Sequence, residues 1–264
     1  MADLLTRADE GGIATLTLSS PANLNALSRA MLLALDHSLA DLAQDASIRV
    51  VVLRAEGRNF CAGHDLKEIQ AARSAPDGGA AEIADLFALC SRIMQAAVAL
   101  PQPVIAEVQG IATAAGCQLA CSCDLIVAAE TARFGVNGIN IGLFCTTPMV
   151  ALTRKLAPAA AFELLTTGEF LSAPRAHTLG LVNRLAAPDR LEAEARSLAE
   201  TLAAKLPQVL RLGKRAFQTQ LGLPLDQAYA TISPIMVENA LMPDTAEGIQ
   251  AFLERRPPGW VPKA

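Results

Sequence analysis

The chain has 264 residues, of which 52% are hydrophobic and 18% are charged, and its formal net charge is -4. This composition excludes an intrinsically disordered chain, because such chains lack the apolar surface that offsets the conformational entropy of folding. The acidic balance and the lack of a basic run disfavour nucleic acid as the main partner. A chain of this length can form one α/β domain with an appendage.

The most apolar stretch of the sequence covers residues 104–129 and is interrupted by Glu107, Gln109, Gln118 and Asp124. A membrane span needs about 20 residues that are almost free of such groups, so this stretch indicates a buried core and no membrane partner. The first twelve residues include acidic side chains and no apolar run, so neither a secretory signal nor an Arg-rich transit peptide is expected. We therefore expect a cytoplasmic protein.

Six cysteines, at positions 61, 90, 117, 121, 123 and 145, are scattered through apolar segments. Because no export signal is predicted, we expect buried free thiols rather than disulfides. Cys121 and Cys123 lack the two-residue spacer of a zinc knuckle, and the three histidines are far apart in the sequence. No metal site is predicted.

The first 60 residues predict a strand, a loop, a helix and a second strand. Alternating apolar residues from Ile13 to Leu18 indicate the first strand, and residues 20–23 break it. The helix is expected to begin near Ser28, a suitable N-cap residue. Its apolar face consists of residues at three- and four-residue intervals, namely Met31, Leu32, Leu35, Leu39 and Leu42. Residues 50–53 are all aliphatic and predict a strand that is buried on both faces.

From residue 82 onward, predicted helices and strands alternate. After a break at 74–79, the patterns predict a helix over 82–100, a strand over 104–108, a helix over 114–121, a strand over 125–128 and an extended piece over 132–134. Such alternation favours a layered α/β fold with parallel strands.

Beyond about residue 191 the sequence shows helical periodicity only. Helices are predicted over 191–206, 209–220, 225–241 and 246–255, with prolines at 207, 224 and 243 between them. We therefore divide the chain into a core, residues 1–190, and a C-terminal helical region, residues 191–264.

Two loops carry the candidate chemistry. Residues 60–67 (Phe-Cys-Ala-Gly-His-Asp-Leu-Lys) and residues 110–118 (Gly-Ile-Ala-Thr-Ala-Ala-Gly-Cys-Gln) each lead from a strand through small residues to a helix start. The first N–H groups of a helix have no partner within the helix. A thioester that becomes an enolate gathers negative charge on its oxygen, and two fixed donors about 3 Å away stabilise that charge. The loops therefore suggest an oxyanion hole, although turn chemistry alone also fits tight packing.

Ordered motifs over nearly the whole chain resemble the enoyl-CoA hydratase/isomerase (crotonase) superfamily. They lie at residues 25–27, 51–54, 60–67, 103–106, 110–120, 123–124, 132–135, 180–182 and 247–256. The resemblance implies an α/β spiral of ββα units and a C-terminal helical region used in trimer formation, in a homotrimer or homohexamer. It also implies an acyl-CoA substrate, with coenzyme A as part of the substrate and no prosthetic group.

By the same resemblance, the backbone N–H groups of His64 and Ala115 would polarise the thioester carbonyl. The coenzyme A moiety would lie along Leu24, Ala26, Ala62, Asp65, Leu66 and Lys67. Phe252 and Arg255 would close on it from a neighbouring subunit. For Lys67 the alternative is an ordinary solvated helix charge.

Two positions depart from the family pattern. Hydratases of this superfamily use two glutamates to add water to the double bond, and those positions hold Gln118 and Gly138 here. Loss of one positioned acid or base typically costs about 10² to 10⁴ in rate, so efficient hydration by the usual mechanism is not expected. Gln118 either orients a water or a substrate carbonyl, or satisfies a buried backbone group.

Four further residues leave alternatives open. Cys145, where other branches place an acid, is either a thiol activated by a lowered pKa or an inert thiol facing the acyl pocket. The His64 ring either reaches that pocket as a base or points to solvent while only its N–H group acts. Glu107 and Asp124 are expected to be structural partners of N–H groups or basic side chains.

Gly138 and residues 144–148 (Phe-Cys-Thr-Thr-Pro) together resemble the enoyl-CoA hydratase domain-containing subgroup. The resemblance implies an enzyme of fatty-acid or related acyl-CoA metabolism, a lyase or an isomerase. A CoA-binding accessory protein with little hydratase activity is the first alternative. An acyl-CoA hydrolase or decarboxylase that uses Cys145 or His64 is the second.

Overall fold

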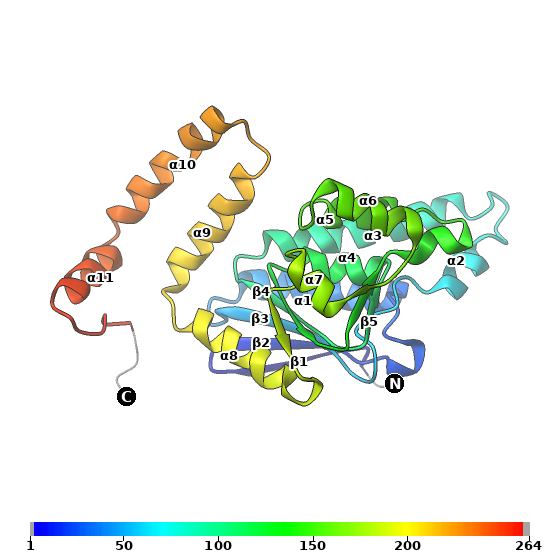
Figure 1. Cartoon of the computed structure of the whole chain (residues 1–264), viewed down its shortest axis with the longest axis horizontal. Helices are drawn as coiled ribbons and strands as arrows, with labels where there is room; N and C mark the ends of the chain where they lie inside the picture. Colours follow the sequence, from blue (N-terminus) through cyan, green and yellow to red (C-terminus); the bar gives the residue numbers. More distant parts are fainter. Residues whose placement is uncertain (1–2, 261–264) are drawn as a thin grey trace.

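The structure is a computed structural model that describes residues 3–260. Its strands form two sheets (Figure 1). The larger sheet has the order β1-β2-β3-β4-β6-β9, with β1 at Leu5–Glu10, β2 at Ile13–Leu18, β3 at Val50–Ala55, β4 at Val104–Val108, β6 at Leu125–Ala129 and β9 at Arg184–Ala186. The smaller sheet has the order β5-β7-β8, with β5 at Ile111–Thr113, β7 at Arg133–Gly135 and β8 at Leu171–Ser172.

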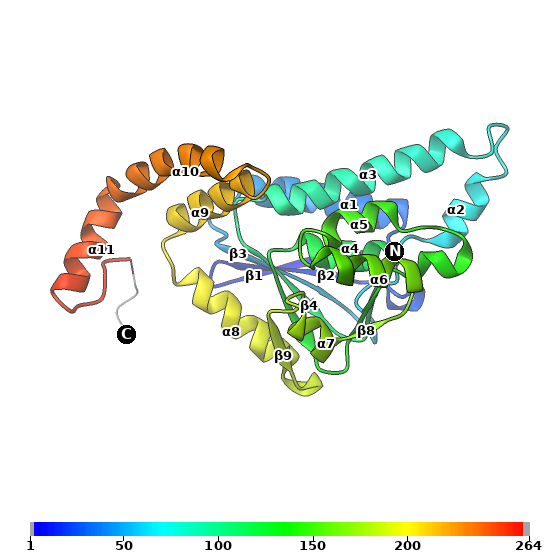
Figure 2. The same cartoon turned by 45° about the horizontal axis from the view of Figure 1, so that its top comes forward.

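Parallel pairing dominates the larger sheet, as the alternating pattern predicts. Only β1 runs antiparallel to its neighbour among these six strands, and β2, β3, β4, β6 and β9 pair in parallel. Parallel strands need long crossovers, which helices supply here. The helices α1 (Arg29–Gln44), α3 (Ala80–Ala99) and α4 (Ala115–Ser122) lie on one side of the sheet and α8 (Leu191–Ala203) on the other (Figures 1 and 2).

A repeated unit builds the spiral that the resemblance implies. In the units β4-β5-α4 and β6-β7-α5, a strand of the larger sheet is followed by a strand of the smaller sheet and then by a helix, with α5 at Thr146–Leu152. Two earlier units replace the second strand by a single bridge, Leu27↔His64 before α1 and Cys61↔Ala112 before α2 (Leu66–Ala72). In each unit, the strand of the smaller sheet, or the single bridge that replaces it, therefore lies close to the loops that carry the candidate chemistry.

Local signals located the first helix well. The Ser28 hydroxyl accepts a hydrogen bond from the Met31 N–H at 3.2 Å, which confirms the predicted cap. The buried residues of α1 are the five of the predicted apolar face. Further short elements that the patterns did not predict are η1 (Pro21–Asn23), η2 (Asn137–Ile141), α5, α6 (Pro158–Thr167), α7 (Ala173–Thr178) and η3 (Pro188–Arg190), together with β1, β5, β8 and β9.

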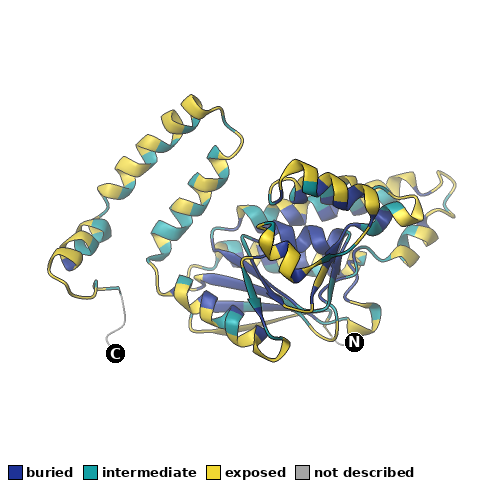
Figure 3. Cartoon of the chain, viewed as in Figure 1, coloured by how far each residue is buried: buried dark blue, intermediate teal, exposed yellow. Residues whose placement is uncertain are grey.

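The C-terminal helices divide into two groups. Leu191, Leu198 and three alanines of α8 are buried against the larger sheet, so α8 is part of the body. In contrast, α9 (Pro207–Gln220), α10 (Leu225–Ala240) and α11 (Pro243–Leu253) reach away from it as an arm (Figures 1 and 2). Ala251 is the only buried residue of these three helices. Figure 3 shows the arm almost entirely in the colours of exposed and intermediate residues. The structure therefore begins the arm after α8, whereas periodicity places the change at residue 191.

The six cysteines are all buried and free, as expected. Asp124 is also the structural partner that the sequence predicts, because its Oδ2 accepts the Val104 N–H at 2.7 Å and lies 2.6 Å from Lys214 Nζ. The same prediction is wrong for Glu107. Its carboxyl makes no hydrogen bond within the described residues, and its basic neighbour Arg54 pairs with Glu192 at 2.7 Å instead.

Between residues 3 and 260, no helix combines the length and the apolarity that crossing a bilayer would require.

Candidate active site

The two candidate loops are in direct contact. The Thr113 N–H donates to the Cys61 carbonyl at 3.0 Å, which ties β5 to the first loop. A β-carbon on Gly116 would lie 2.3 Å from the same carbonyl oxygen, so only glycine fits at this crossing. A β-carbon on Gly63 would lie 3.3 Å from the Ala115 nitrogen. Tertiary packing thus brings together two helix starts that the sequence shows only separately.

Each loop ends in a free backbone donor. His64 precedes α2, and Ala115 is the first residue of α4. Within residues 3–260, neither the His64 N–H nor the Ala115 N–H donates to a protein acceptor, and the first backbone bond of α4 joins the Gln118 N–H to the Ala114 carbonyl. Two neighbouring N–H groups are therefore available to one ligand oxygen.

Ala114 shapes the turn into α4. Its backbone has φ 49° and ψ -123°, a conformation that L-residues rarely adopt and that costs about 1–3 kcal/mol. The Ala114 N–H donates to the Gly135 carbonyl at 2.9 Å and holds this conformation. Because an alanine gives no local signal for a positive φ, the sequence did not reveal this strained position.

The predicted coenzyme A residues of the first segment lie beside the first loop. The Ala62 N–H donates to the Leu24 carbonyl at 3.1 Å, and the Leu27 N–H donates to the Gly63 carbonyl at 2.7 Å. Ala26, between them, is 7% exposed, whereas the side chain of Leu24 is half exposed. A pocket of about 370 Å³ lies next to this segment, between residues 21–25 and 56–59.

Asn25 holds this segment in place, a role that the sequence motif did not define. Its side chain is fully buried and satisfied, because Nδ2 donates to the carbonyls of Glu56 at 2.8 Å and Asn59 at 2.9 Å. Its Oδ1 accepts the Ser20 N–H at 2.9 Å. These bonds stabilise the left-handed backbone of Leu24 and Asn25, whose φ angles are 52° and 53°.

Asp65 caps the N-terminus of α2, and Leu66 and Lys67 are its first two residues. The Asp65 carboxylate accepts hydrogen bonds from Asn23 Nδ2 at 2.8 Å and from the Lys67 N–H at 2.9 Å. The bond from Asn23, followed by the helix cap, lowers the pKa of Asp65. Leu66 and Lys67 are exposed. The six predicted coenzyme A residues of the body therefore lie on two adjoining segments, with Leu24, Leu66 and Lys67 exposed and Ala26 buried.

The ring of His64 does not point to solvent, so that alternative is wrong. It packs edge to face on Phe87 of α3, with ring centroids 5.1 Å apart and planes at 83°. Both ring nitrogens are buried, and neither makes a hydrogen bond of ordinary geometry within the described residues, although the backbone of Leu27 lies near the ring. Burial lowers the pKa of His64, which favours the neutral ring at pH 7. Nothing in the sequence pointed to Phe87, an aromatic residue on a distant helix.

Gln118 is 4% exposed, and its Oε1 is buried without a partner among the described residues. The interpretation that its side chain satisfies a backbone group is therefore wrong. Gln118 follows Ala115 by three residues on the same face of α4, and helical side chains lean toward the N-terminus. Both residues are buried in α4.

Gly138 leaves no room for the missing second glutamate. A β-carbon there would lie 2.3 Å from the Leu143 carbonyl oxygen and 2.9 Å from Cys145 Sγ. Cys145 itself is 6% exposed, and burial raises the pKa of its thiol. A raised pKa disfavours the thiolate that nucleophilic attack needs, so the structure supports an inert thiol.

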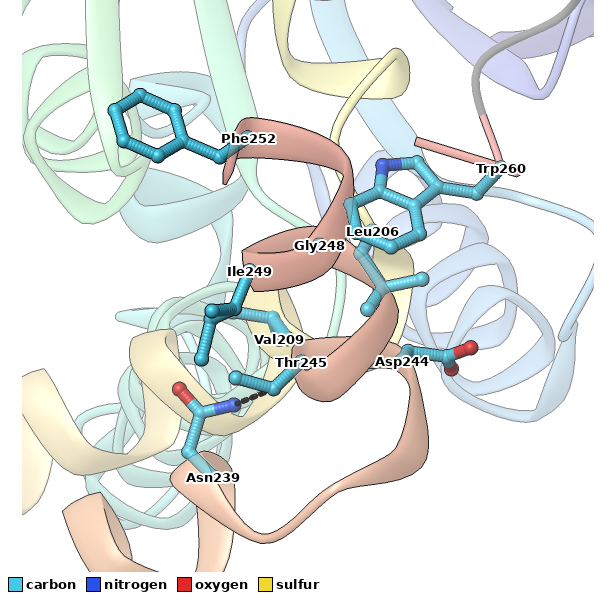
Figure 4. A pocket seen from close by; sticks show the side chains of 9 residues that line it. All are labelled: Leu206, Val209, Asn239, Asp244, Thr245, Gly248, Ile249, Phe252 and Trp260. Atoms are coloured by element: carbon cyan, nitrogen blue, oxygen red, sulfur yellow. Dashed lines mark hydrogen bonds between the residues drawn. The ribbon is translucent and has the colours of Figure 1, made fainter. Parts of the chain in front are cut away.

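Phe252 and Arg255 lie at the far end of the arm. In Figures 1 and 2, α11 and α2 occupy opposite ends of the molecule, so these two residues do not join the loops of their own chain. Phe252 is 82% exposed. It borders a pocket of about 350 Å³ between α9 and α11, together with Leu206, Ile249 and Trp260 (Figure 4).

Comparison with known proteins gives a consistent result. Residues 8–263 match the family model described as enoyl-CoA hydratase/isomerase. The chain is 41% identical over 252 residues to the mitochondrial enoyl-CoA hydratase domain-containing protein 3 of Xenopus laevis, covering 96% of this chain and 84% of that protein.

Two solved structures have the same fold. The enoyl-CoA hydratase of Mycobacterium smegmatis gives a TM-score of 0.93 at 50% identity and covers 97% of this chain and 98% of its own. Human enoyl-CoA hydratase domain-containing protein 3 gives 0.92 at 40% identity, with 97% and 100% covered.

Proposed function

The chain belongs to the enoyl-CoA hydratase/isomerase family, and from this premise we propose that the His64 and Ala115 N–H groups hold the oxygen of an acyl-CoA thioester and stabilise its enolate. The observation that carries the proposal is the pair of free donors on two touching loops. Fixed backbone dipoles need no reorganisation during reaction, and removing one such donor typically costs about 10² to 10³ in rate.

The coenzyme A moiety would lie along the strip formed by residues 24–26 and 62–67. Its pantetheine chain would run beside the backbones of Leu24 and Ala62, which a hydrogen bond joins. Lys67 is exposed and forms no ion pair in the part of the chain that the structure describes, so its ammonium group is available to a phosphate. Coenzyme A enters as part of the substrate, and no prosthetic group is proposed.

Hydration through two glutamates is not available to this site, because Gln118 does not titrate and Gly138 has no room for a side chain. We expect an enzyme that acts on the enolate as a lyase or isomerase, with slow hydration of ordinary enoyl-CoA. A CoA-binding accessory protein is the second candidate, favoured by the filled space at Gly138. The raised pKa of Cys145 disfavours a hydrolase that uses this thiol.

A homotrimer, alone or stacked as a hexamer, is the proposed assembly. The arm carries large exposed apolar side chains, among them Phe217, Leu225, Tyr229 and Leu241. Exposed apolar surface of this extent is typical of an interface. Phe252 and Arg255 would then reach the coenzyme A strip of a neighbouring subunit. The cytoplasmic location stays a prediction from the sequence.

Replacing Ala115 by proline tests the donor pair. Proline is well tolerated at the first position of a helix, and the N–H group that it removes has no protein acceptor. Because proline also clashes with the β-carbon of a preceding residue whose ψ is -123°, the variant and its reference protein both carry Ala114→Gly. We expect Ala115→Pro to lower the turnover of acyl-CoA by at least about 10²-fold with little change in coenzyme A binding. Ala115→Gly keeps the N–H group and should keep activity.

Ala80→Pro is the matched control, since Ala80 is the exposed first residue of α3. Thermal unfolding establishes that each variant folds, and calorimetry measures binding. Failure of the wild-type protein to bind coenzyme A or any acyl-CoA at millimolar concentration would overturn the proposal, as would equal turnover by Ala115→Pro and its reference protein.

A further inference from the structure

The edge strand β1 leaves one row of its backbone groups without partners. It lies at the end of the larger sheet and pairs on one side only, with β2 (Figure 1). Five of its six residues are exposed. Within residues 3–260, no backbone group of a helix or loop bonds to the outer side of this strand. Free N–H and C=O groups along a sheet edge are a template for a further strand.

The register of the hairpin identifies the residues that present these groups. The Ser19 N–H donates to the Leu4 carbonyl at 2.7 Å, and β1 pairs antiparallel with β2. Residues opposite each other in such a pair alternate between bonded and unbonded, so the even-numbered residues of β1 bond to β2. Leu5, Arg7 and Asp9 therefore direct three N–H groups and three carbonyls away from the sheet.

The charged side chains of β1 divide between the two faces of the sheet. Arg7 Nη2 lies 2.7 Å from Asp9 Oδ2 and 2.7 Å from Asp45 Oδ2, at the end of α1. Glu10 pairs with Arg196 of α8 at 2.8 Å, on the other face. Because alternate residues of a strand share a face, Arg7 and Asp9 would meet the same face of any strand added at this edge.

This charge pattern is complementary to itself in one antiparallel register. When two copies of β1 run antiparallel with Ala8 opposite Ala8, Arg7 of each copy faces Asp9 of the other. Both residues direct their backbone outward, so each such pair also exchanges two backbone hydrogen bonds. A shift by two residues would bring Arg7 opposite Arg7 or Asp9 opposite Asp9, and like charges directly opposite each other destabilise a strand pair.

We propose that β1 pairs with β1 of a second copy of this chain and joins the two larger sheets into one continuous sheet. An edge that repels other strands commonly carries charges of one sign, whereas β1 carries both signs on one face. The twofold contact uses both edges and therefore closes at two copies without growing into a fibre. This contact involves neither the acyl-CoA loops nor the arm, and so goes beyond the proposed function.

Ala8→Cys tests the register. In the proposed pair Ala8 lies opposite itself in an unbonded position, where α-carbons are about 4.5 Å apart and a disulfide can form. We expect the variant, treated at micromolar concentration with oxidised glutathione, to give a covalent dimer on a non-reducing gel. The six native cysteines are buried, so the wild type should give no such product.

Thr6→Cys is the matched control. Thr6 is exposed and lies on the same face of β1 as Ala8. In the proposed register it faces Glu10 of the second copy, so two thiols at this position are roughly 13 Å apart along the strands. A disulfide cannot span this distance, and Thr6→Cys should give at least about 10-fold less covalent dimer than Ala8→Cys.

Charge reversal tests the complementarity. Arg7→Glu places a glutamate opposite Asp9, and Asp9→Lys places a lysine opposite Arg7. Each variant alone should therefore associate through β1 at least about 10-fold more weakly than the wild type, as measured by analytical ultracentrifugation. An equimolar mixture of the two variants brings opposite charges together at both positions and should restore association. Thermal unfolding establishes that each variant folds.

Two results would overturn the pairing of β1. One is an Ala8→Cys protein that gives no more covalent dimer than Thr6→Cys, which would leave only random collision between thiols. The other is a mixture of the charge variants that associates no better than either variant alone. Neither result bears on acyl-CoA binding, which calorimetry measures separately, so the proposed function stands or fails on its own test.

Discussion

The imidazole of His64 meets the phenyl ring of Phe87 edge to face, with centroids 5.1 Å apart. An aromatic pair of this kind contributes about 0.5–1.5 kcal/mol beyond the burial of its area. The contact joins the loop before α2 to α3 and turns the ring away from solvent. Through it, a residue of a separate helix fixes the orientation of the His64 ring.

Phe87→Ala should restore access of water to the His64 ring. Burial lowers the pKa of His64 in the wild type, so this pKa should rise toward the ordinary value of histidine in the variant. An NMR titration of the imidazole signals measures it. The signals of the exposed His37 on α1 serve as an internal control and should not change. An unchanged titration of His64 would show that Phe87 does not shield the ring.

Gly138→Glu should fail to restore hydration of crotonyl-CoA. The new β-carbon would lie 2.3 Å from the Leu143 carbonyl oxygen, so the variant should lose about 1–3 kcal/mol of unfolding free energy through overpacking. Gly138→Ala adds the same β-carbon without the carboxylate and should be destabilised to a similar extent. Thermal unfolding and a hydration assay check both. A stable Gly138→Glu protein with a hundredfold gain in hydration would refute this account.

Glu107 should make stability fall as the pH rises from about 4.5 to about 7. Its side chain lies in β4 and is 8% exposed, and burial raises its pKa to about 7. In this window the folded state holds a proton that the unfolded state has released, so raising the pH favours unfolding. The loss levels off above pH 7 and amounts to at most about 3 kcal/mol, since one pKa unit corresponds to about 1.4 kcal/mol.

Glu107→Gln should lack this component of the pH dependence. Urea unfolding of both proteins between pH 4.5 and 8 gives the difference in unfolding free energy. The variant should gain relative to the wild type as the pH rises through the window. A constant difference across the window would mean that Glu107 titrates normally in the folded state.

Lys214→Met should destabilise the attachment of the arm. Lys214 Nζ, on α9, lies 2.6 Å from Asp124 Oδ2 and also donates to the Gln102 carbonyl at 2.9 Å. The side chains of Lys214 and Asp124 are 8% and 19% exposed. Loss of the lysine therefore leaves the Asp124 carboxylate largely buried and without this cation. Removing one partner of such a pair costs about 3–5 kcal/mol.

Urea unfolding checks this prediction, with Lys205→Met at an exposed lysine as the control. The double variant Asp124→Asn/Lys214→Met removes both charges and should recover part of the loss. Equal stability of Lys214→Met and the wild type would show that the ion pair does not anchor α9.

Local sequence patterns predicted most of the longer elements and the two loops that carry the candidate chemistry. Apolar spacing located α1 and its buried face, a continuous aliphatic run located β3, a mostly apolar run located β4, and the two small-residue loops contain the free donors. These features depend on residues close in sequence, whose periodicity and capping fix where a helix or strand begins. The ordered motifs were also sufficient to predict the family.

Only the tertiary structure decided what surrounds those donors. It turned the His64 ring onto Phe87, left Gln118 without a partner, and filled the space at Gly138 with Leu143 and Cys145. It also packed α8 on the sheet while leaving α9 to α11 uncovered. The direction of a side chain and the space around it depend on atoms from distant segments. A periodic pattern shows that a face is apolar but not what covers it.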